Sequence, residues 1–497
     1  MARTKAGLGT GARLSDYLGA SLLARVYPAD LIGRILDEQC CNSKRIRTLP
    51  AVSGTYFCMA LSLYPESAYE QVFAVVSQGL SWMQGQDAEV SIAKSSISEM
   101  RAKIGYVPLQ RLIDQACVPL ADEKRHPDAF YCGLRLVAID GSNLEVADEA
   151  DNIKAFGYPG SRTGHAGYPQ AQCAVLVECA SHAIIAANLG AYRTSEWAIC
   201  APLLTRLDAS MLCLADRGFN GYAMWAAAQA TGSQLLWRCA NNRILPVVKA
   251  LADGSYLSTL YPAGTLSKKQ RQASTAGIVV RVIDYALPNA AAAEPRYRLL
   301  TTLLDETQAP ARELATLYHQ RWEVEAVFDE LKVHLLQRRR VLRSKTADLV
   351  HQEFYGWVLA HYAARWLMHQ AATEHRVRDR DLSFAANVQL LRIAQPQSGA
   401  FPPSKTSENE GAGLRRCWRT RRACGASPAA GCKTRARSSG AIPHSLAMTA
   451  PRRRTSRAIT HLNYFLRFQC QSEKSTGKLS NRTVLGQVLQ HSIYASW

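Results

Sequence analysis

Apolar side chains recur at spacings of three and four positions near the start of the chain, which is the pattern of amphipathic helices. The pattern is clearest over Leu22–Leu36, Tyr56–Gln84 and Ile97–Ala121. Pro28 and Pro50 stand where helices would begin or be separated. We therefore predict that the N-terminal part of the chain is helical.

Two later stretches, Leu134–Asp140 and Met211–Asp216, alternate between two faces instead. Both faces of the first stretch are apolar, which favours an interior strand of a covered sheet. Each stretch ends in an aspartate with a glycine close behind it, a signal for the end of a strand. A carboxylate at the end of a buried strand is costly to desolvate unless it is hydrogen-bonded or holds a metal ion. Asp140 is therefore either an Asx-turn residue or a functional group.

The segments around these strands continue the mixture of sheet and helix patterns. Ala171–Ala187 has the pattern of a β-hairpin with its turn near Ala180-Ser181, and Tyr222–Ala230 has that of a helix. From Gln234 to Leu304 the pattern is strand-like and less regular. Strands and helices thus alternate through the middle of the chain, as in an α/β fold.

The stretch Leu314–Leu335 contains no Gly or Pro and has the composition of an amphipathic helix. On a helical wheel of about 100° per residue, four polar side chains share a stripe about 60° wide, beside an apolar stripe. These four are Tyr318, Arg321, Glu325 and Lys332. A surface helix with an ion pair between Arg321 and Glu325 would explain this pattern without any function.

The spacing of the four residues is more specific than an amphipathic helix requires. Two residues separate the Tyr from the Arg, three separate the Arg from the Glu, and six separate the Glu from the Lys. This spacing resembles, without a gap, the signature of the bacterial transposases of the insertion-sequence-four family. The stretches VAIDGSNLEVAD, KAFGYPGS and LADRGFNGYAMW resemble the family's blocks around its first and second aspartates. The resemblance implies an α/β fold: a ribonuclease-H-like core with a helical N-terminal domain and a β-rich insertion before the catalytic helix.

The same resemblance implies that Asp140, Asp216 and Glu325 are the catalytic, metal-binding carboxylates of a DDE site. DNA cleavage and strand transfer are phosphoryl transfers, in which two divalent cations typically about 3.5–4 Å apart activate the nucleophile and stabilise the leaving oxygen. Hard oxygen ligands suit two ions of Mg²⁺ or Mn²⁺. We assign the bridge between the two ions to Asp140.

The other members of the stripe have chemistry suited to DNA. Arg321 can grip a phosphate through two hydrogen bonds. Lys332 supplies a point charge and Tyr318 a hydroxyl donor, and in the resembling family these residues hold the DNA end while the reaction passes through a hairpin.

Further candidates for DNA contact lie outside the stripe. The piece from Ser91 to Gly105 is either the second half of a helix-turn-helix or part of a small bundle with solvated lysines. The first alternative directs Lys94, Arg101 and Lys103 toward DNA. Two residues of the predicted insertion, Arg238 and Arg243, would lie close to the DNA backbone if the family match holds. Trp237 is either a stacking residue for an unpaired base or a core residue on an inward-facing strand.

The resemblance implies a DNA transposase that moves an insertion sequence by cut-and-paste. Its partners would be double-stranded DNA, both transposon ends and target, and a second copy of the chain in a synaptic dimer. The alternative is a catalytically inactive remnant that only binds transposon ends. A host nuclease on the same core is a third possibility, although it would not need the Tyr-Arg-Lys stripe.

The formal net charge of +19 favours a polyanionic partner, but its distribution changes that inference. From Phe401 onward, 17 Lys or Arg face 3 Asp or Glu, a net of +14, whereas the first 400 residues carry 42 against 37, a net of +5. This tail is rich in Arg, Ser, Ala, Gly and Pro with little periodicity, and we expect it to be disordered. It is either a basic arm that holds DNA or sequence translated out of its ancestral frame.

The 14 cysteines are scattered and form no CxxC pair, which is typical of free thiols in a reducing compartment. The sequence contains no apolar run of about 18 residues and no apolar signal core near its first residue. We therefore expect a cytoplasmic, nucleoid-associated protein without a membrane partner.

Five parts are predicted along the chain: a helical domain that binds DNA ends, a first part of the catalytic core, a β-rich insertion, a second part of the core with helices, and the basic tail. Their expected bounds are 1–125, 126–236, 237–305, 306–395 and 396–497.

Overall fold

The structure is a computed structural model. It describes residues 22–44, 49–83, 92–161, 164–165, 167–219, 221–262, 277–286, 296–336 and 341–392. The expected basic tail, 396–497, lies outside the described residues.

The N-terminal part is helical, as predicted. Its helices are α2 (Ala29–Glu38), α3 (Ala51–Leu63), α4 (Tyr69–Met83), α5 (Lys94–Ile104) and α6 (Val107–Ala116). Almost every residue of α3 is buried, because this helix is apolar all round and packs against the long helix α13 (Ala347–His375). The two helices approach closely at Gly356, where a Cβ atom would lie 2.5 Å from the carbonyl oxygen of Cys58.

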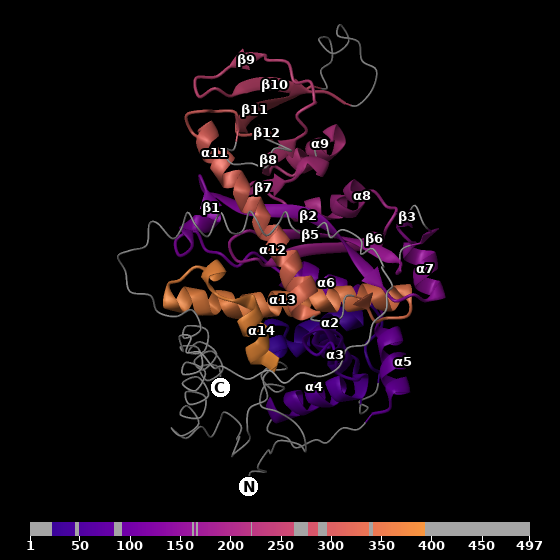
Figure 1. Ribbon diagram of the computed structural model, residues 1–497. Helices are drawn as coiled ribbons and strands as arrows, with labels where there is room; N and C mark the ends of the chain where they lie inside the picture. The colour runs from indigo at the N-terminus through magenta and orange to yellow at the C-terminus, as the bar shows by residue number, and fades with distance from the viewer. Residues whose placement is uncertain are drawn as a thin grey trace, which may run out of the picture.

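The centre of the molecule is a mixed sheet with the strand order β6-β5-β2-β7-β8-β12-β11-β10-β9 (Figure 1). The strands on this path are β2 (Leu134–Val146), β5 (Gln170–Glu178), β6 (Ile184–Ala191), β7 (Met211–Ala215), β8 (Gln234–Cys239), β9 (Lys249–Ala250), β10 (Tyr256–Leu260), β11 (Ile278–Ala286) and β12 (Arg296–Thr301). Two short strands, β1 (Phe130–Tyr131) and β13 (Val341–Leu342), also pair with β2.

The pairing within this sheet is that of a ribonuclease-H-like core. Strands β2, β5 and β6 form an antiparallel meander, and β7 then joins β2 in parallel, followed by β8 in parallel with β7. A parallel connection between β6 and β7 needs a crossover, which contains α8 (Glu196–Cys200). The predicted fold class is therefore confirmed.

The β-rich segment after β8 continues the same sheet. Strand β12 pairs antiparallel with β8, and β11 and β10 follow in antiparallel order. Figure 1 shows these strands stacked beyond β7 and β8, away from the N-terminal helices. The boundary expected at residue 237 falls inside strand β8, so the insertion shares its backbone hydrogen bonds with the core.

The central strand β2 is covered on both faces, as its alternating apolar pattern predicts. Leu136 and Ala138 belong to the core that includes α13 and the N-terminal helices. Val137 and Ile139 belong to a second core with residues of α8 and of α9 (Tyr222–Ala230). Asp140 has the parity of Leu136 and Ala138, the same face of the sheet that α12 (Glu323–Asp329) crosses in Figure 1.

Two predictions about local structure need correction. Strand β2 does not end at Asp140: Gly141 and the residues after it stay in the strand because they pair with β5 as far as Glu145. The stretch Leu314–Leu335 is not one α-helix. It passes from α11 (Ala311–Tyr318) through a 3₁₀ turn, α12 and a π-helical segment, Glu330–Leu335.

The remaining helices are α7 (Ala150–Phe156) and α14 (Phe384–Arg392). Among the described residues, none of the helices is both long enough and apolar enough to span a membrane.

Candidate active site

Asp140 and Asp216 lie where two parallel strands of the central sheet separate. The last paired residues of β2 and β7 are Ile139 and Ala215, and each aspartate directly follows one of them. Beyond this point β2 pairs with β5 and, at Glu145 and Val146, with β13, whereas the chain leaves β7 through a 3₁₀ turn, Arg217–Phe219. The two carboxylates thus come from neighbouring strands at one edge of the parallel region.

Arg321 connects this strand edge with the helix above it. Its Nη1 lies 3.2 Å from Oδ2 of Asp140, and its Nη2 lies 2.8 Å from Oε1 of Glu325. The arginine is buried, whereas the Glu325 side chain is 54% exposed. One guanidinium therefore forms an ion pair with each of two carboxylates that are 185 positions apart in the sequence.

The Asp140 carboxyl is hard to ionise in this environment. Its pKa is raised to about 7: burial is the largest cause, Arg321 and the Gly141 backbone N–H oppose it, and the Asp216 and Glu325 carboxylates add smaller increases. These effects mark the three carboxylates as electrostatic neighbours. A site of this kind holds negative charge at neutral pH most readily when a cation is present.

The donor chemistry of the three carboxylates fits a hard divalent cation. In this structure they have not converged on one point: no three His, Cys, Asp or Glu side chains among the described residues are close enough to hold a metal ion. Arg321 lies between Asp140 and Glu325 instead. Asp216 has a hydrogen bond from the Gly218 backbone and, among the described residues, no cationic partner. The donor chemistry of the residues therefore fits a divalent cation.

The other two stripe residues also face the sheet. The Tyr318 hydroxyl is buried and donates to the carbonyl of Ala215 at 3.3 Å. The Lys332 ammonium donates to the hydroxyl of Ser142 and to the carbonyl of Asn143, both on β2. All four stripe residues thus lie along the open end of β7 and the continuing part of β2, and their contacts here are to protein groups.

Glu196 adds a fourth carboxylate at this edge, and the sequence did not point to it. It is the first residue of α8, and its carboxylate lies beside Gly141 and Gly218. Burial, and then the Asp216 carboxylate, raise its pKa. The only sequence signal was Ser195, which caps α8 through its side chain and so marks a helix start, not a site.

The structure separates the other candidates for DNA contact. Arg101 is only 1% exposed, and its guanidinium donates to Gln352, Tyr69 and Ser344, so its predicted contact with DNA is incompatible with this fold. Lys94 and Lys103 are exposed on the same helix, α5.

The two arginines of the insertion lie on the β8 side of the sheet. Arg238 is partly exposed and stacks over the Tyr297 ring at 4.2 Å, and the carbonyl of Arg243 accepts a hydrogen bond from Arg298. Trp237 is fully buried and packs edge-on against Trp225, so the core explanation of this residue is correct.

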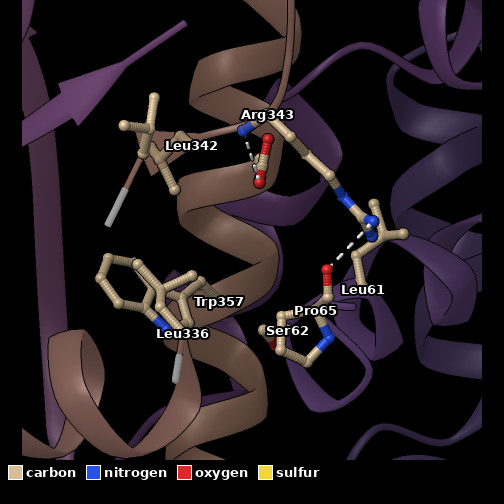
Figure 2. A pocket seen from close by; sticks show the side chains of 9 residues that line it. Leu61, Ser62, Pro65, Leu336, Leu342, Arg343 and Trp357 are labelled. Carbon is tan, nitrogen blue, oxygen red and sulfur yellow. Dashed lines mark hydrogen bonds between the residues drawn. The ribbon is translucent and has the colours of Figure 1, made fainter. Parts of the chain in front are cut away.

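A small pocket lies elsewhere, between α3, β13 and α13 (Figure 2). Its lining includes Leu61, Leu342 and Trp357, and Arg343 crosses it to reach the carbonyl of Pro65. None of the three site carboxylates lines it, so it is not part of the candidate active site.

Two family models match the chain. One, described as the N-terminal region of insertion element 4 transposases, matches residues 18–114. The other, described as the transposase DDE domain, matches residues 131–363, a range that contains Asp140, Asp216 and Glu325.

Individual proteins are similar as well. The transposase InsG for insertion sequence element IS4, from Escherichia coli strain K12, is 26% identical over 398 residues, which cover 78% of this chain and 84% of the relative. A solved structure, a piggyBac transposase synaptic complex with hairpin DNA, is 10% identical with a TM-score of 0.38 and covers 78% of this chain and 81% of that chain.

Proposed function

This chain belongs to the insertion-sequence-four family of DDE transposases, and we propose that it excises an insertion sequence by metal-dependent DNA cleavage and joins it to target DNA by cut-and-paste. The observation that carries this proposal is the double contact of Arg321 with Asp140 and Glu325 beside Asp216. It brings the three carboxylates of the DDE pattern to one edge of a ribonuclease-H-like sheet.

In this proposal Asp140, Asp216 and Glu325 hold two Mg²⁺ or Mn²⁺ ions. Divalent cations would supply an activated nucleophile and stabilise the leaving deoxyribose oxygen. Asp140 is the residue best placed to serve both ions, because its carboxyl is electrostatically coupled to both of the other carboxylates.

Arg321 has two roles in this scheme. Without metal it pairs with Asp140 and Glu325, and if cations took its place at those carboxylates its guanidinium would be free to grip a DNA phosphate. Lys332 fixes the part of β2 beyond Asp140 through Ser142 and Asn143. Tyr318 fixes the end of β7 through Ala215, next to Asp216. Contact of Lys332 and Tyr318 with DNA remains part of the proposal.

The partners in this proposal are the element's own ends, target DNA and a second copy of the chain. The exposed residues Lys94 and Lys103, with Arg238 and Arg243 of the insertion, are the candidate phosphate contacts. A cytoplasmic, nucleoid-associated location follows from these partners.

The test is cleavage of a linear duplex that carries the element's own end, with Mg²⁺ or Mn²⁺, by wild type and by Glu325→Gln. We expect nicking or hairpin formation that depends on the metal and is lost in the variant by at least about a hundredfold. The matched control is Asp329→Asn on the same helix, whose carboxylate pairs with His334 and should be dispensable for cleavage.

Other outcomes would contradict the proposal. Cleavage by Glu325→Gln at the wild-type rate would remove this residue from the site. No cleavage by wild type, with binding to the element's end retained, would favour the catalytically inactive remnant.

A further inference from the structure

Glu196 reaches the separating strand ends from a third direction. A Cβ atom on Gly141 would lie 2.8 Å from its Oε1, and a Cβ atom on Gly218 would lie 3.0 Å from its Oε2. These two glycines follow Asp140 by one position and Asp216 by two. The carboxylate therefore occupies the space that a side chain at either glycine would fill.

Asp216 shares that space. Its Oδ1 also lies 3.0 Å from the same Cβ position on Gly218, so one oxygen of Asp216 and one of Glu196 face a common point. Beyond the effect of burial, the Asp216 carboxylate raises the pKa of Glu196, as expected of two neighbouring negative charges that a proton or a cation would stabilise.

Neither carboxylate has a cation to balance it. Among the described residues, the Glu196 carboxylate has no hydrogen-bond or ion-pair partner, and Asp216 has no ion pair. Arg321 contacts only Asp140 and Glu325 with its two terminal nitrogens. The side of the site that faces α8 is thus left with unbalanced negative charge.

A structural role accounts poorly for this position. An acidic residue in a first helical turn gains a little from the helix dipole, but α8 has only five residues and Ser195 already caps it. Its neighbour Trp197 is exposed, so the first turn of α8 is not fixed by deep burial. The two glycines leave room for the carboxylate at a place where it gains no bond to the protein.

We propose that Glu196 is a fourth carboxylate ligand of the metal site, holding a divalent cation together with Asp216. This inference rests on the proposed function, because the cation is the one required for DNA cleavage. A carboxylate from α8 adds a hard oxygen donor beside Asp216, near Gly218. The site then draws its ligands from β2, β7, α12 and α8.

The test measures Mn²⁺ binding by electron paramagnetic resonance, in which free Mn²⁺ gives the signal, with the full chain bound to a duplex carrying the element's end. Wild type is compared with Glu196→Gln and Asp216→Asn. We expect Glu196→Gln to raise the Kd for Mn²⁺ about tenfold or more, or to remove one bound ion. The glutamine keeps the shape of the side chain, so the thermal midpoint without metal should stay the same or rise.

The matched control is Glu313→Gln, which changes an acidic residue in the first turn of α11 that accepts a hydrogen bond from Tyr131. It should bind Mn²⁺ like wild type. If Asp216→Asn loses Mn²⁺ and cleavage while Glu196→Gln keeps both, the inference about Glu196 is wrong and the proposed function stands. If neither variant changes Mn²⁺ binding and wild type does not cleave, both are wrong.

Discussion

Arg321 takes the position between two carboxylates that a metal ion is expected to take. Its ion pairs with Asp140 and Glu325 offset the repulsion that three carboxylates would otherwise suffer in one partly buried place. An arginine that is displaced by metal and then binds phosphate would link metal loading to DNA capture. This link makes the resting contacts of Arg321 a testable part of the mechanism.

The first prediction concerns Arg321→Ala without DNA. In EDTA, the free energy of unfolding should fall by about 1–3 kcal/mol, because Asp140 loses its cation while it stays buried. Added Mg²⁺ or Mn²⁺ should restore part of the loss, since the ion neutralises the same carboxylates. Chemical denaturation with and without metal measures both effects.

Arg298→Ala is the control for that experiment. Arg298 forms a two-bonded ion pair with Asp284 on the β-rich insertion. Its loss should lower stability without any recovery on adding metal. Equal metal effects on the two variants would mean that Arg321 does not stand where the metal binds.

The second prediction separates the basic residues of α5. Arg101→Ala should lower the free energy of unfolding by about 3 kcal/mol, because the buried partners Gln352 and Ser344 lose their hydrogen bonds. Lys94→Ala and Lys103→Ala should leave stability unchanged and lower the salt slope of DNA binding by about 1 each. Chemical denaturation checks the prediction for Arg101, and salt titration of DNA binding checks the prediction for the two lysines. An Arg101→Ala variant with wild-type stability that only binds DNA less well would contradict the prediction for Arg101.

At the scale of single residues, the sequence predicted the position of a side chain where a local pattern or a family motif includes that residue. The alternation of Leu134–Asp140 pointed to the face that Asp140 takes, and the resemblance singled out Arg321 and Glu325. Glu196 had no such signal, because its neighbourhood with Asp216 exists only after the crossover folds onto the sheet. Arg101 looked like a phosphate contact, since periodicity does not distinguish a solvated cation from one buried against Gln352.

At the scale of elements, the catalytic helix is tied to α13 by a buried polar cluster. Glu330, at the start of the π-helical segment, pairs with Arg365, and its carboxylate lies 2.8 Å from Nε2 of His361 and 2.9 Å from Nδ1 of His182. His182 also contacts Glu323 of α12 through Nε2 at 2.8 Å. The helix that bears Glu325 is therefore held in place by contacts that include His182 and His361, whose charges depend on pH.

The third prediction is acid destabilisation through this cluster. Burial, with the nearby His182, lowers the pKa of His361 to about 3, and burial together with Arg365 lowers the pKa of His182. An unfolded histidine has a pKa of about 6.5, so below that pH the unfolded state binds more protons than the folded state. The resulting stability is fully present above about pH 6.5 and is lost as the pH falls toward about 3.

Denaturation midpoints between about pH 7.5 and 5 measure this loss. His361→Gln keeps a donor for Glu330 but cannot take up a proton, so its midpoint should fall less steeply than that of wild type. His334→Gln, at a partly exposed position of the same helical segment, should follow the wild-type curve. Parallel curves for wild type and His361→Gln would exclude His361 as the cause.

Element boundaries were predictable where a pattern was long or sharply ended. The helix expected over Tyr222–Ala230 has those bounds in the structure, and the hairpin β5–β6 lies where its two apolar runs placed it. The end of β2 was misjudged because Gly141-Ser142 reads as a turn, whereas pairing with β5 keeps these residues extended. The π-helical segment also escaped prediction: its first residue, Glu330, pairs with Arg365 of α13, a contact that the local sequence does not encode.

At the scale of the whole molecule, one sheet connects the active-site edge with the β-rich insertion. The hydrogen bonds between β8 and β12 make the insertion an extension of the core. The predicted domain bounds therefore describe the order of the chain better than they describe separate bodies. The order of core and insertion along the chain could be predicted from the family resemblance. The register between β8 and β12 could not, because it pairs residues about 60 positions apart, such as Arg238 and Leu299, and no local pattern encodes such a pairing.

The distribution of charge gives the fourth prediction, on deletion of residues 396–497. The segment from Phe401 onward carries a net charge of +14, whereas the first 400 residues carry +5. Salt dependence of DNA binding reports the number of phosphates neutralised, with a slope of about −0.9 for each phosphate contacted. If the tail is a basic arm, deleting it should weaken binding to random duplex and flatten the salt slope.

Preference for the element's end should survive the same deletion. The parts of the chain that match the family models, residues 18–114 and 131–363, are retained, and they hold the exposed lysines of α5 and the carboxylate site. We therefore expect the ratio of end binding to random binding to rise, because only the sequence-independent contribution is removed. Fluorescence anisotropy over a range of salt concentrations, with both duplexes, measures the two slopes. An unchanged slope would mean that the tail does not touch DNA, as expected of out-of-frame sequence. A lost preference would assign end recognition to the tail.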